Sequence, residues 1–561
     1  MQARAPAYFS PDPKEVDVDS IARVEWEGAP AIHRAMAEWR AILGATQVLE
    51  EAVATKAYSA NTSGSERRIV GALRLSRSEV LPEVMRIANR YGVPVYPIST
   101  GRNWGYGTAL PAKDDGVIID LSLLRRILHF DSDMGVVTVE PGVTQAMLAD
   151  FLDANGYEFM VPVTGAGPEC SLIGNVLERG YGITPHADHF GAMTDVEAVL
   201  ADGTRYQTTL REAGGEDLAR LFKWGVGPYS AGLFSQSGFG IVTRMSLMLA
   251  PRPECVKVCL FSLRDDALLS PAIRAVRMLL TSLPGIIGGL NMMNRHRVLA
   301  MSMPYPRDRL DADGLISSSV MESLGRDYCV APWTGYATLY GTKRIVSAAE
   351  QEIRTKLGGL ASRLRFISPR RAQWYAAASS WIPGQTQIAR TTKLLSRSMD
   401  LVLGRPSQTA LPLAYWRSGA QVAEGKNGKL NPAKDGCGLM WYSPLVPVRS
   451  AAVIDYVNMV KRVTREHGIE PLITLTTISD KLFDSTVPLL FERGCASSVR
   501  SARECYDALL SDGEKIGCFP YRFGIDSMSS LRERAPESIS IHERLRQAFD
   551  SNDILAPGRY R

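Results

Sequence analysis

The chain of 561 residues lacks any long apolar run and any low-complexity tract. It also lacks internal repeats with a period of roughly 20–50 residues. A helix that crosses a membrane needs about 20 consecutive, mostly apolar residues, so we expect no transmembrane segment. The opening stretch MQARAPAYFSPDP has no apolar core of the kind found in signal peptides. These absences favour a cytoplasmic location.

The chain also has no strong excess of charge of one sign. It has no cysteine pairs with the spacing of a metal site. The 64 Lys and Arg residues and 59 Asp and Glu residues give a net charge of +5, spread along the chain, which argues against a nucleic-acid partner. The eight cysteines form no C-x-x-C pair, and His186 and His189 are the only close pair of histidines. We therefore expect reduced thiols and no bound metal.

The sequence is long for a single hydrophobic core, so we expect two or more domains. Residues 1–250 alternate short β-branched runs with amphipathic helical patterns and many glycine turns. Within them, residues 68–92 predict a strand followed by a helix, Thr144 begins a predicted helix that ends at Gly156, and Asp202-Gly203 predicts a hairpin. In residues 251–500 long helical patterns alternate with strands, which predicts helices on one face of an antiparallel sheet. Residues 501–561 end in another glycine turn. The predicted fold class is α+β.

The most informative stretch that is present is VYPISTGRNWGYGTALP, residues 95–111, in which a β-rich segment runs into Gly101, Gly105 and Gly107. Glycine reaches positive φ without steric cost, so such a loop can fold its backbone N–H groups around an anion. The spacing matches neither G-x-x-x-x-G-K-[ST] nor G-x-G-x-x-G. Taken alone, the loop is more often a plain surface connection; as a binding loop, it would hold a pyrophosphate.

Four further segments follow this loop in a characteristic order. They are LIGNVLERGYGITPHADHF (172–190), GLFSQSGFGIVT (232–243), PYR (520–522) and ILAPGRYR (554–561). With the glycine loop, they closely resemble the vanillyl-alcohol oxidase and p-cresol methylhydroxylase family of FAD enzymes. The resemblance implies a two-domain fold. Residues 1–250 and 501–561 would form the FAD-binding domain, and residues 251–500 a cap of antiparallel sheet and helices over the flavin ring.

The resemblance also assigns cofactor-binding residues, which are mostly glycine-permitted, backbone-rich positions suited to a dianion. For Gly174 and Gly240 the alternative is simple tight packing. The residues expected to bind FAD are Pro97, Ile98, Ser99, Thr100, Gly101, Arg102, Asn103, Trp104, Gly105, Gly174, Asn175, Gly180, His189, Gly240, Ile241, Val242 and Arg559.

Members of this family that act on para-substituted phenols hold the phenolic oxygen with two tyrosines and an arginine, and Tyr106, Tyr521 and Arg522 match them. A phenol pKa near 10 makes ionisation at neutral pH cost about 4 kcal/mol. Charge-assisted hydrogen bonds contribute roughly 1.5–3 kcal/mol each. One arginine and two hydroxyl donors can therefore stabilise a phenolate in a water-poor pocket. The alternative for Tyr521 and Arg522 is a surface pair without a role.

The sequence departs from the family at the active-site base. Vanillyl-alcohol oxidase has an aspartate nine residues before the Asn of the GN-x-x-ERG motif, and the same count back from Asn175 reaches Ala166. Glu169 is the nearest carboxylate, and it is either a substitute catalytic residue or an exposed loop residue. The departure leaves open whether the quinone methide is hydrated, or whether the product is an alkene or another compound.

A second departure concerns the covalent flavin bond. Leu439 stands where the oxidase branch has its flavin-linked cap histidine, which excludes a histidyl bond at that position. The p-cresol branch uses a tyrosine, for which Tyr415 is the best candidate and Tyr442 a weaker one. Non-covalent FAD is the open alternative, in which both tyrosines belong to the core.

We therefore expect an FAD-dependent oxidoreductase that transfers a hydride from the benzylic carbon of a 4-substituted phenol to flavin N5, through a p-quinone methide. By resemblance, the electron acceptor is O₂ or a c-type cytochrome, and the protein is a homodimer. A cytochrome partner would also permit a periplasmic location. Two alternatives stay open, namely oxidation of a non-phenolic alcohol or hydroxy acid on the same fold, and a flavin-binding subunit without turnover.

Overall fold

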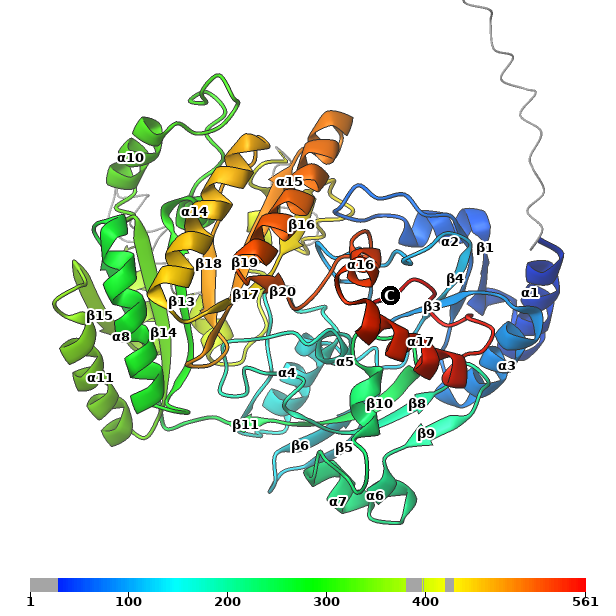
Figure 1. Cartoon of the computed structure of the whole chain (residues 1–561). Helices are drawn as coiled ribbons and strands as arrows, with labels where there is room; N and C mark the ends of the chain where they lie inside the picture. Colours follow the sequence, from blue (N-terminus) through cyan, green and yellow to red (C-terminus); the bar gives the residue numbers. More distant parts are fainter. Residues whose placement is uncertain (1–28, 380–395, 397, 419–427) are drawn as a thin grey trace, which may run out of the picture.

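The computed structural model describes residues 29–379, 396, 398–418 and 428–561. Within these residues, the strands form sheets of four, five and nine strands and one two-stranded pair (Figure 1). All eight cysteines lie in the described part and are free thiols. Among the described helices, none combines the length and apolar character needed to cross a bilayer.

The four-stranded sheet positions the glycine loop. Its strand order is β1-β2-β4-β3, with β2, β4 and β3 parallel. Helix α3 buries its apolar face on this sheet and ends at Gly92, as the 68–92 pattern predicted. The elements are α1 (Ala29–Leu43), β1 (Val48–Glu50), α2 (Glu51–Tyr58), β2 (Ile69–Arg74), α3 (Leu81–Tyr91), β3 (Val95–Ile98) and β4 (Gly116–Asp120).

The five-stranded sheet is antiparallel and has the order β5-β6-β10-β8-β9. The predicted hairpin at Asp202-Gly203 joins β8 to β9, and Gly203 has φ +84°. The predicted helix start at Thr144 is also present, since the Thr144 hydroxyl accepts a hydrogen bond from the Met147 N–H. The elements are β5 (Ile127–Asp131), β6 (Val136–Val139), α4 (Gln145–Ala154), β7 (Phe159–Met160), α5 (Leu172–Leu177), β8 (Met193–Val199), β9 (Arg205–Gln207), α6 (Thr209–Glu212), α7 (Glu216–Leu221), β10 (Ile241–Met248) and β11 (Ala250–Pro251), with β7 and β11 paired.

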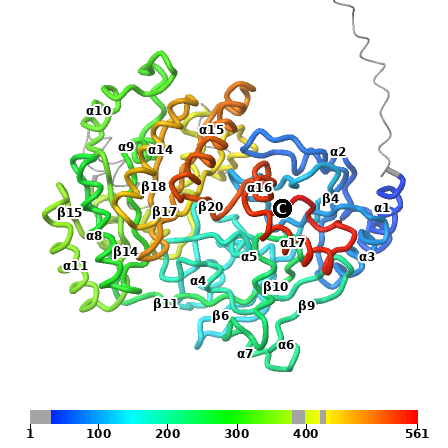
Figure 2. The backbone as a smooth tube through the Cα atoms, in the orientation of Figure 1, coloured from blue at the N-terminus to red at the C-terminus, as the bar shows by residue number. Residues whose placement is uncertain are grey.

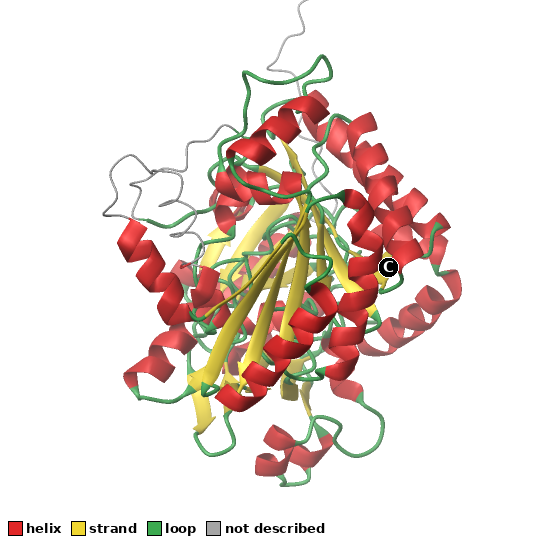
Figure 3. Ribbon diagram, turned by 90° about the vertical axis from the view of Figure 1, so that its left-hand side faces the viewer, coloured by secondary structure: helices red, strands yellow, loops and turns green. Residues whose placement is uncertain are grey.

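The nine-stranded sheet is antiparallel throughout, and a layer of helices covers one of its faces (Figure 3). Helices α11, α8, α14 and α15 lie in a row against it. The strands are β12 (Cys255–Leu263), β13 (Ile287–Asn294), β14 (Trp333–Gly341), β15 (Arg363–Ile367), β16 (Gly438–Tyr442), β17 (Pro444–Pro447), β18 (Thr474–Thr477), β19 (Leu482–Phe491) and β20 (Phe519–Pro520). The helices are α8 (Leu269–Ser282), α9 (Arg295–Ser302), α10 (Ser318–Asp327), α11 (Lys343–Leu357), α12 (Pro369–Ser379), α14 (Ser450–Glu466) and α15 (Ala496–Lys515), followed by α16 (Leu531–Arg534) and α17 (Pro536–Phe549).

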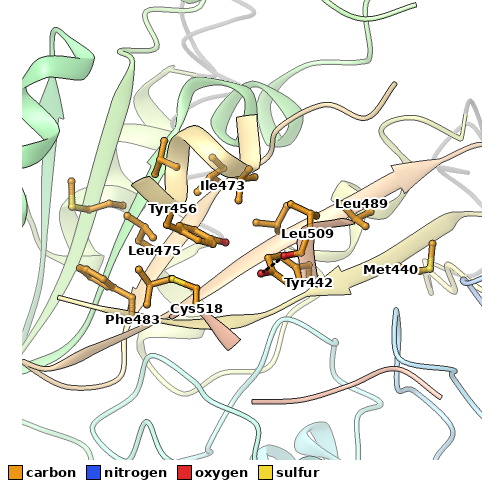
Figure 4. Packing of buried hydrophobic residues seen from close by; sticks show 14 of the residues in the cluster. Met440, Tyr442, Tyr456, Ile473, Leu475, Phe483, Leu489, Leu509 and Cys518 are labelled. Atoms are coloured by element: carbon orange, nitrogen blue, oxygen red, sulfur yellow. Dashed lines mark hydrogen bonds between the residues drawn. The ribbon is translucent and has the colours of Figure 1, made fainter. Parts of the chain in front are cut away.

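Strand β19 divides its side chains between the core and the opposite face. Phe483, Val487 and Leu489 pack into the core under α14 and α15 (Figure 4). On the same face the Tyr456 hydroxyl donates to the Ser485 hydroxyl at 2.8 Å. Because side chains alternate along a strand, the even-numbered residues of β19 face away from these helices, toward the first half of the chain.

The end of the chain returns to the first sheet. The Val95 N–H donates to the Ile554 carbonyl at 2.7 Å, and the Ala556 N–H donates to the Val95 carbonyl at 2.8 Å. Figure 2 shows this red segment beside the blue strands. The α+β, two-domain fold class is confirmed. The exact domain boundaries stay a prediction, and the one placed at residue 501 falls inside α15, which packs on β16 and β19.

Candidate active site

The glycine loop between β3 and β4 forms one wall of a cavity of about 430 Å³. Gly101, Gly105 and Gly107 have φ values of +63°, +75° and +120°, where residues with a Cβ are strained. A Cβ on Gly101 would also lie 3.1 Å from the Ala109 Cβ. Glycine therefore permits three of the left-handed positions in this loop, and Thr108, with φ +62°, occupies another.

The cavity gathers most of the residues that the sequence predicted, from segments far apart in the chain. Those that line it are Pro97, Ile98, Ser99, Thr100, Gly101, Arg102, Asn103, Trp104, Tyr106, Gly174, Asn175, Gly180, Gly240, Ile241, Val242, Tyr521, Arg522 and Arg559. Gly105, Glu169, His189 and Tyr415 do not line it.

Two arginines share one buried glutamate in the cavity wall. Arg559 forms an ion pair with one carboxylate oxygen of Glu178, and the Arg522 Nε lies 3.3 Å from the other, too poorly aligned for a hydrogen bond. Although burial raises it, the two guanidinium groups hold the pKa of Glu178 below its usual value. Two cations against one anion leave a net positive charge that can attract an anionic ligand.

Tyr106 and Arg522 lie against each other at the inner end of the glycine loop. The Arg522 Cζ stands 4.1 Å from the centre of the Tyr106 ring, and its Nη2 donates to Asn103 Oδ1 at 2.5 Å. The Tyr106 hydroxyl lies 2.8 Å from the Ser443 hydroxyl. Burial raises the pKa of Tyr106 to about 12, so this phenol is neutral and can donate a hydrogen bond at neutral pH.

Tyr521 brings a carboxylate into the same group. Its ring packs edge-on against Tyr181 with centroids 5.7 Å apart, and its hydroxyl lies near enough to Asp484 of β19 to affect the pKa of that carboxyl group. Burial raises the pKa of Asp484 to about 7, against the opposing effects of Arg522 and Tyr521. The Asp484 Oδ1 is buried and has no hydrogen-bond partner among the described residues. A buried carboxylate that titrates near neutral pH, beside two tyrosines and an arginine, can accept a proton.

Asp484, Ser443 and Glu178 belong to the site but were not predicted from the sequence. Asp484 carries a signal that could have been used, because it is a single carboxylate inside the apolar strand pattern KLFDSTVPLLF. Glu178 lies within the ERG segment of a motif already singled out. Ser443 carries no signal of its own, since its role depends on where β16 ends relative to the glycine loop.

Glu169 lies at the edge of the molecule rather than in the cavity. Its carboxylate accepts from Arg102 at 2.6 Å and from Lys429 at 2.8 Å, and its side chain is 41% exposed. The bond from Lys429, with the charge of Arg102, lowers its pKa. Both oxygens of this carboxylate are therefore engaged in surface ion pairs.

The remaining predicted residues outside the cavity support its walls. The Gly105 N–H donates to the Thr62 hydroxyl at 2.9 Å. His189 is buried, its Nδ1 lies 2.5 Å from the Asn175 side-chain amide, and burial lowers its pKa to about 3. The imidazole is therefore neutral, and it orients Asn175, which does line the cavity.

The two tyrosines considered for a flavin bond lie in different surroundings. The Tyr415 hydroxyl donates to Asp435 Oδ2 at 2.5 Å. Tyr442, the last residue of β16, is fully buried in the core, and its hydroxyl donates to the Leu509 carbonyl at 2.9 Å (Figure 4). Neither hydroxyl is directed by these bonds into the cavity.

The cavity walls fit FAD. At the glycine-loop end, Gly101 and Gly174 line the cavity, and a Cβ on Gly174 would lie 3.0 Å from the Ser99 hydroxyl. Backbone without side chains at these positions suits a phosphate chain. At the other end, the net positive charge of Arg522, Arg559 and Glu178 suits an electron-accepting ring that becomes more negative on reduction.

Comparisons with known proteins agree with this fit. Residues 71–209 match the family model described as FAD binding domain. The chain is 30% identical over 531 residues to 1'-carboxy-chondrochloren decarboxylase of Chondromyces crocatus, covering 94% of this chain and 97% of that protein. It is 27% identical over 534 residues to the flavoprotein subunit of 4-cresol dehydrogenase [hydroxylating] of Pseudomonas putida, covering 94% and 95%. The crystal structure of p-cresol methylhydroxylase with substrate bound superimposes with a TM-score of 0.83 at 26% identity, covering 95% of this chain and 97% of that one.

Proposed function

Because the chain belongs to the vanillyl-alcohol oxidase and p-cresol methylhydroxylase family of FAD-dependent oxidoreductases, we propose that it oxidises a 4-substituted phenol. The benzylic carbon loses a hydride to flavin N5 of the bound FAD, and the substrate becomes a p-quinone methide. The observation that carries the proposal is the meeting of Tyr106, Tyr521 and Arg522 in one cavity with the predicted FAD-binding residues.

The protein's own groups account for the phenolate that this reaction needs. Tyr106 and Tyr521 donate hydrogen bonds to the phenolic oxygen, and Arg522 supplies the positive charge. The phenolic proton passes by way of the Tyr521 hydroxyl to Asp484, whose raised pKa of about 7 suits a base at neutral pH. Tyr106 and Asp484 are buried and Tyr521 and Arg522 are largely so, which limits how far water weakens their electrostatic effect.

The cofactor-binding assignment follows the same cavity. Backbone groups of the glycine loop would hold the phosphate chain and ribityl part of FAD. Gly174 and Asn175 of α5, with Gly240, Ile241 and Val242 at the start of β10, would hold more of the cofactor, and Arg559 would lie near the flavin. A covalent bond between Tyr415 and FAD requires the Tyr415 hydroxyl to leave Asp435, because that hydroxyl donates its hydrogen bond to the Asp435 carboxylate.

The fate of the quinone methide depends on which carboxylates reach it. Ala166 lines the cavity where the family has an aspartate, and the acidic residues of the described cavity wall are Glu178 and Asp484. Glu178 is committed to two arginines. Without a third carboxylate to activate water, we favour an alkene product. Similarity to a decarboxylase supports a variant of this outcome, in which a carboxylate on the neighbouring carbon leaves as CO₂ and the ring regains aromaticity.

The electron acceptor and the assembly are further parts of the proposal. Similarity to the flavoprotein subunit of 4-cresol dehydrogenase supports a separate electron-accepting partner, a c-type cytochrome, with O₂ as the alternative. We propose that the protein is a homodimer. It lies in the cytoplasm or, if its partner is a cytochrome, in the periplasm.

The test is anaerobic titration of the purified yellow protein. We expect 4-alkylphenols to bleach the long-wavelength flavin band and their O-methyl ethers to leave it unchanged, because only the phenols can ionise. Bleaching by 2-hydroxy acids but not by phenols would favour the hydroxy-acid alternative. Retained FAD that no phenol or hydroxy acid reduces would favour a binding subunit without turnover.

A further inference from the structure

We propose that Arg297 binds a carboxylate on the para side chain of the substrate, so that the substrate is a phenol at one end and an anion at the other. This inference rests on the proposed phenol oxidation. Nothing in the sequence pattern singled out Arg297, which comes from α9 of the cap and lines the cavity.

Among the residues that the structure describes, none supplies a counter-ion to Arg297. Its Nη1 is fully buried and has no hydrogen-bond partner among them, while its Nε donates to the Thr474 hydroxyl at 3.0 Å. Burial lowers the pKa of Arg297 to about 10. A buried guanidinium with a free donor is unfavourable unless an acceptor fills the place, so the side chain is held ready for a ligand.

The other arginines of the described cavity wall are already paired. Arg102 binds Glu169 at 2.6 Å, and Arg522 and Arg559 share Glu178. Arg297 is the one left for an anion that enters with the substrate. Its planar fork of N–H donors matches the two oxygens of a carboxylate.

The sheet places Arg297 at a suitable distance from the phenol end. Thr474 of β18 lies opposite Thr486 of β19, and Asp484 is two residues along the same face of β19. Two residues of strand span about 7 Å. Thr486 and Asp484 both line the cavity, so the guanidinium over Thr474 and the Tyr521–Asp484 pair mark two ends of one wall.

Apolar side chains line the same cavity beside these polar groups. Leu439 and Trp441 of β16, which pair with Leu490 and Pro488 of β19, line it together with Leu413. A pocket with apolar walls and polar groups at separate points binds an aromatic body and fixes its orientation by its polar ends. The ligand class that fits is a phenol with a short carboxylate-bearing side chain.

The test compares 3-(4-hydroxyphenyl)propanoate with its neutral amide, 3-(4-hydroxyphenyl)propanamide. Calorimetric titration is done anaerobically on holoenzyme reduced with dithionite, because reduced flavin cannot take up a hydride and binding is measured without turnover. We expect the propanoate to bind at least about tenfold more tightly than the amide, as charge-assisted bonds predict. The preference should fall to near unity in Arg297→Met and survive in part in Arg297→Lys.

Arg295→Gln is the matched control, because Arg295 lies on the same helix but donates to the Val330 carbonyl outside the cavity wall. It should keep the wild-type preference. Equal affinities in the wild type, or a preference that persists in Arg297→Met, would overturn the inference. Loss of FAD from Arg297→Met without any wild-type preference would also overturn it, since Arg297 would then serve the cofactor.

The two proposals fail separately. If 4-propylphenol bleaches the oxidised enzyme and the propanoate shows no preference, the role of Arg297 is wrong and phenol oxidation stands. If the propanoate is preferred through Arg297 but no phenol bleaches the flavin, the carboxylate receptor stands and the proposed function is wrong.

Discussion

At the scale of single residues, the site depends on where hydroxyl and guanidinium groups are held relative to one another. Tyr106 shows this, because its hydroxyl meets Ser443 while its ring carries Arg522 at 4.1 Å. The sequence predicted Tyr106, Tyr521 and Arg522 as a group because their motifs occur in family order. It did not predict their partners, because Ser443 and Asp484 come from the cap and only the folded sheet brings them there.

Removing one phenolate donor should slow reduction of the flavin. We expect Tyr106→Phe to lower the anaerobic bleaching rate with a 4-alkylphenol by about 10–100-fold, since one hydrogen bond to developing charge contributes roughly 1.5–3 kcal/mol. Stopped-flow absorbance measures the rate. Tyr456→Phe is the control, because that buried hydroxyl bonds Ser485 in the core and should leave the rate unchanged. Equal rates for wild type and Tyr106→Phe would contradict the assigned role.

The raised pKa of Asp484 predicts how the rate of flavin bleaching depends on pH. Its pKa is about 7 in the folded protein and about 4 in an unfolded chain. Since ionised Asp484 accepts the phenolic proton, the bleaching rate should rise as pH increases through about 7. Asp484→Asn should lose this limb and be slower at every pH at which the wild type is ionised. An unchanged pH profile in Asp484→Asn would rule out Asp484 as the base.

The raised pKa of Asp484 also makes the folded protein less stable at higher pH. An ion-paired carboxylate, whose pKa is lowered, has the opposite effect. The folded protein holds the Asp484 proton more tightly than the unfolded chain, so this group makes folding progressively less favourable as pH rises from about 4 through about 7. The effect reaches a few kcal/mol, at 1.36 kcal/mol per pKa unit. We expect Asp484→Asn to raise Tm relative to wild type at pH 8 and not at pH 4, measured calorimetrically on the same holoenzyme preparations.

At the scale of elements, the fold is mostly predictable from periodicity and the site is not. The strand–helix pattern over residues 68–92, the helix after Thr144 and the hairpin at Gly203 are all present because each depends on local sequence. The cavity depends instead on β19, whose alternation puts Asp484 opposite the glycine loop. That placement arises from strand pairing in a nine-stranded sheet, and no local pattern encodes it.

The glycine loop gives a prediction with a matched control. Gly101 and Gly92 have φ values of +63° and +62°, but a Cβ on Gly101 meets Ala109, whereas on Gly92 it meets nothing within 4 Å. Both Gly→Val variants carry a strain of about 1–2 kcal/mol. We expect only Gly101→Val to lose FAD, measured as flavin absorbance relative to protein absorbance. Equal flavin retention in both variants would show that the loop does not touch the cofactor.

At the scale of the whole molecule, the end of the chain closes the cavity that the first half begins. Ile554 and Ala556 bond to Val95, and Arg559 reaches Glu178 and the Ser237 carbonyl. Removal of residues 554–561 therefore takes away both a backbone connection and one of the two cations on Glu178. We expect the truncated protein to lose FAD and to unfold at a lower temperature, because FAD stabilises only the folded state.

Arg559→Gln separates the two contributions, since it keeps the backbone bonds to Val95 and removes only the charge. Glu178 then faces Arg522 alone, and the net charge of this group falls from +1 to 0. We expect Arg559→Gln to fold with FAD bound but with a more negative flavin midpoint potential, because a positive charge near the ring favours the reduced, more negative state. Redox titration against dyes of known potential measures this, and an unchanged potential would mean that the Glu178 group is a structural joint and does not act on the flavin.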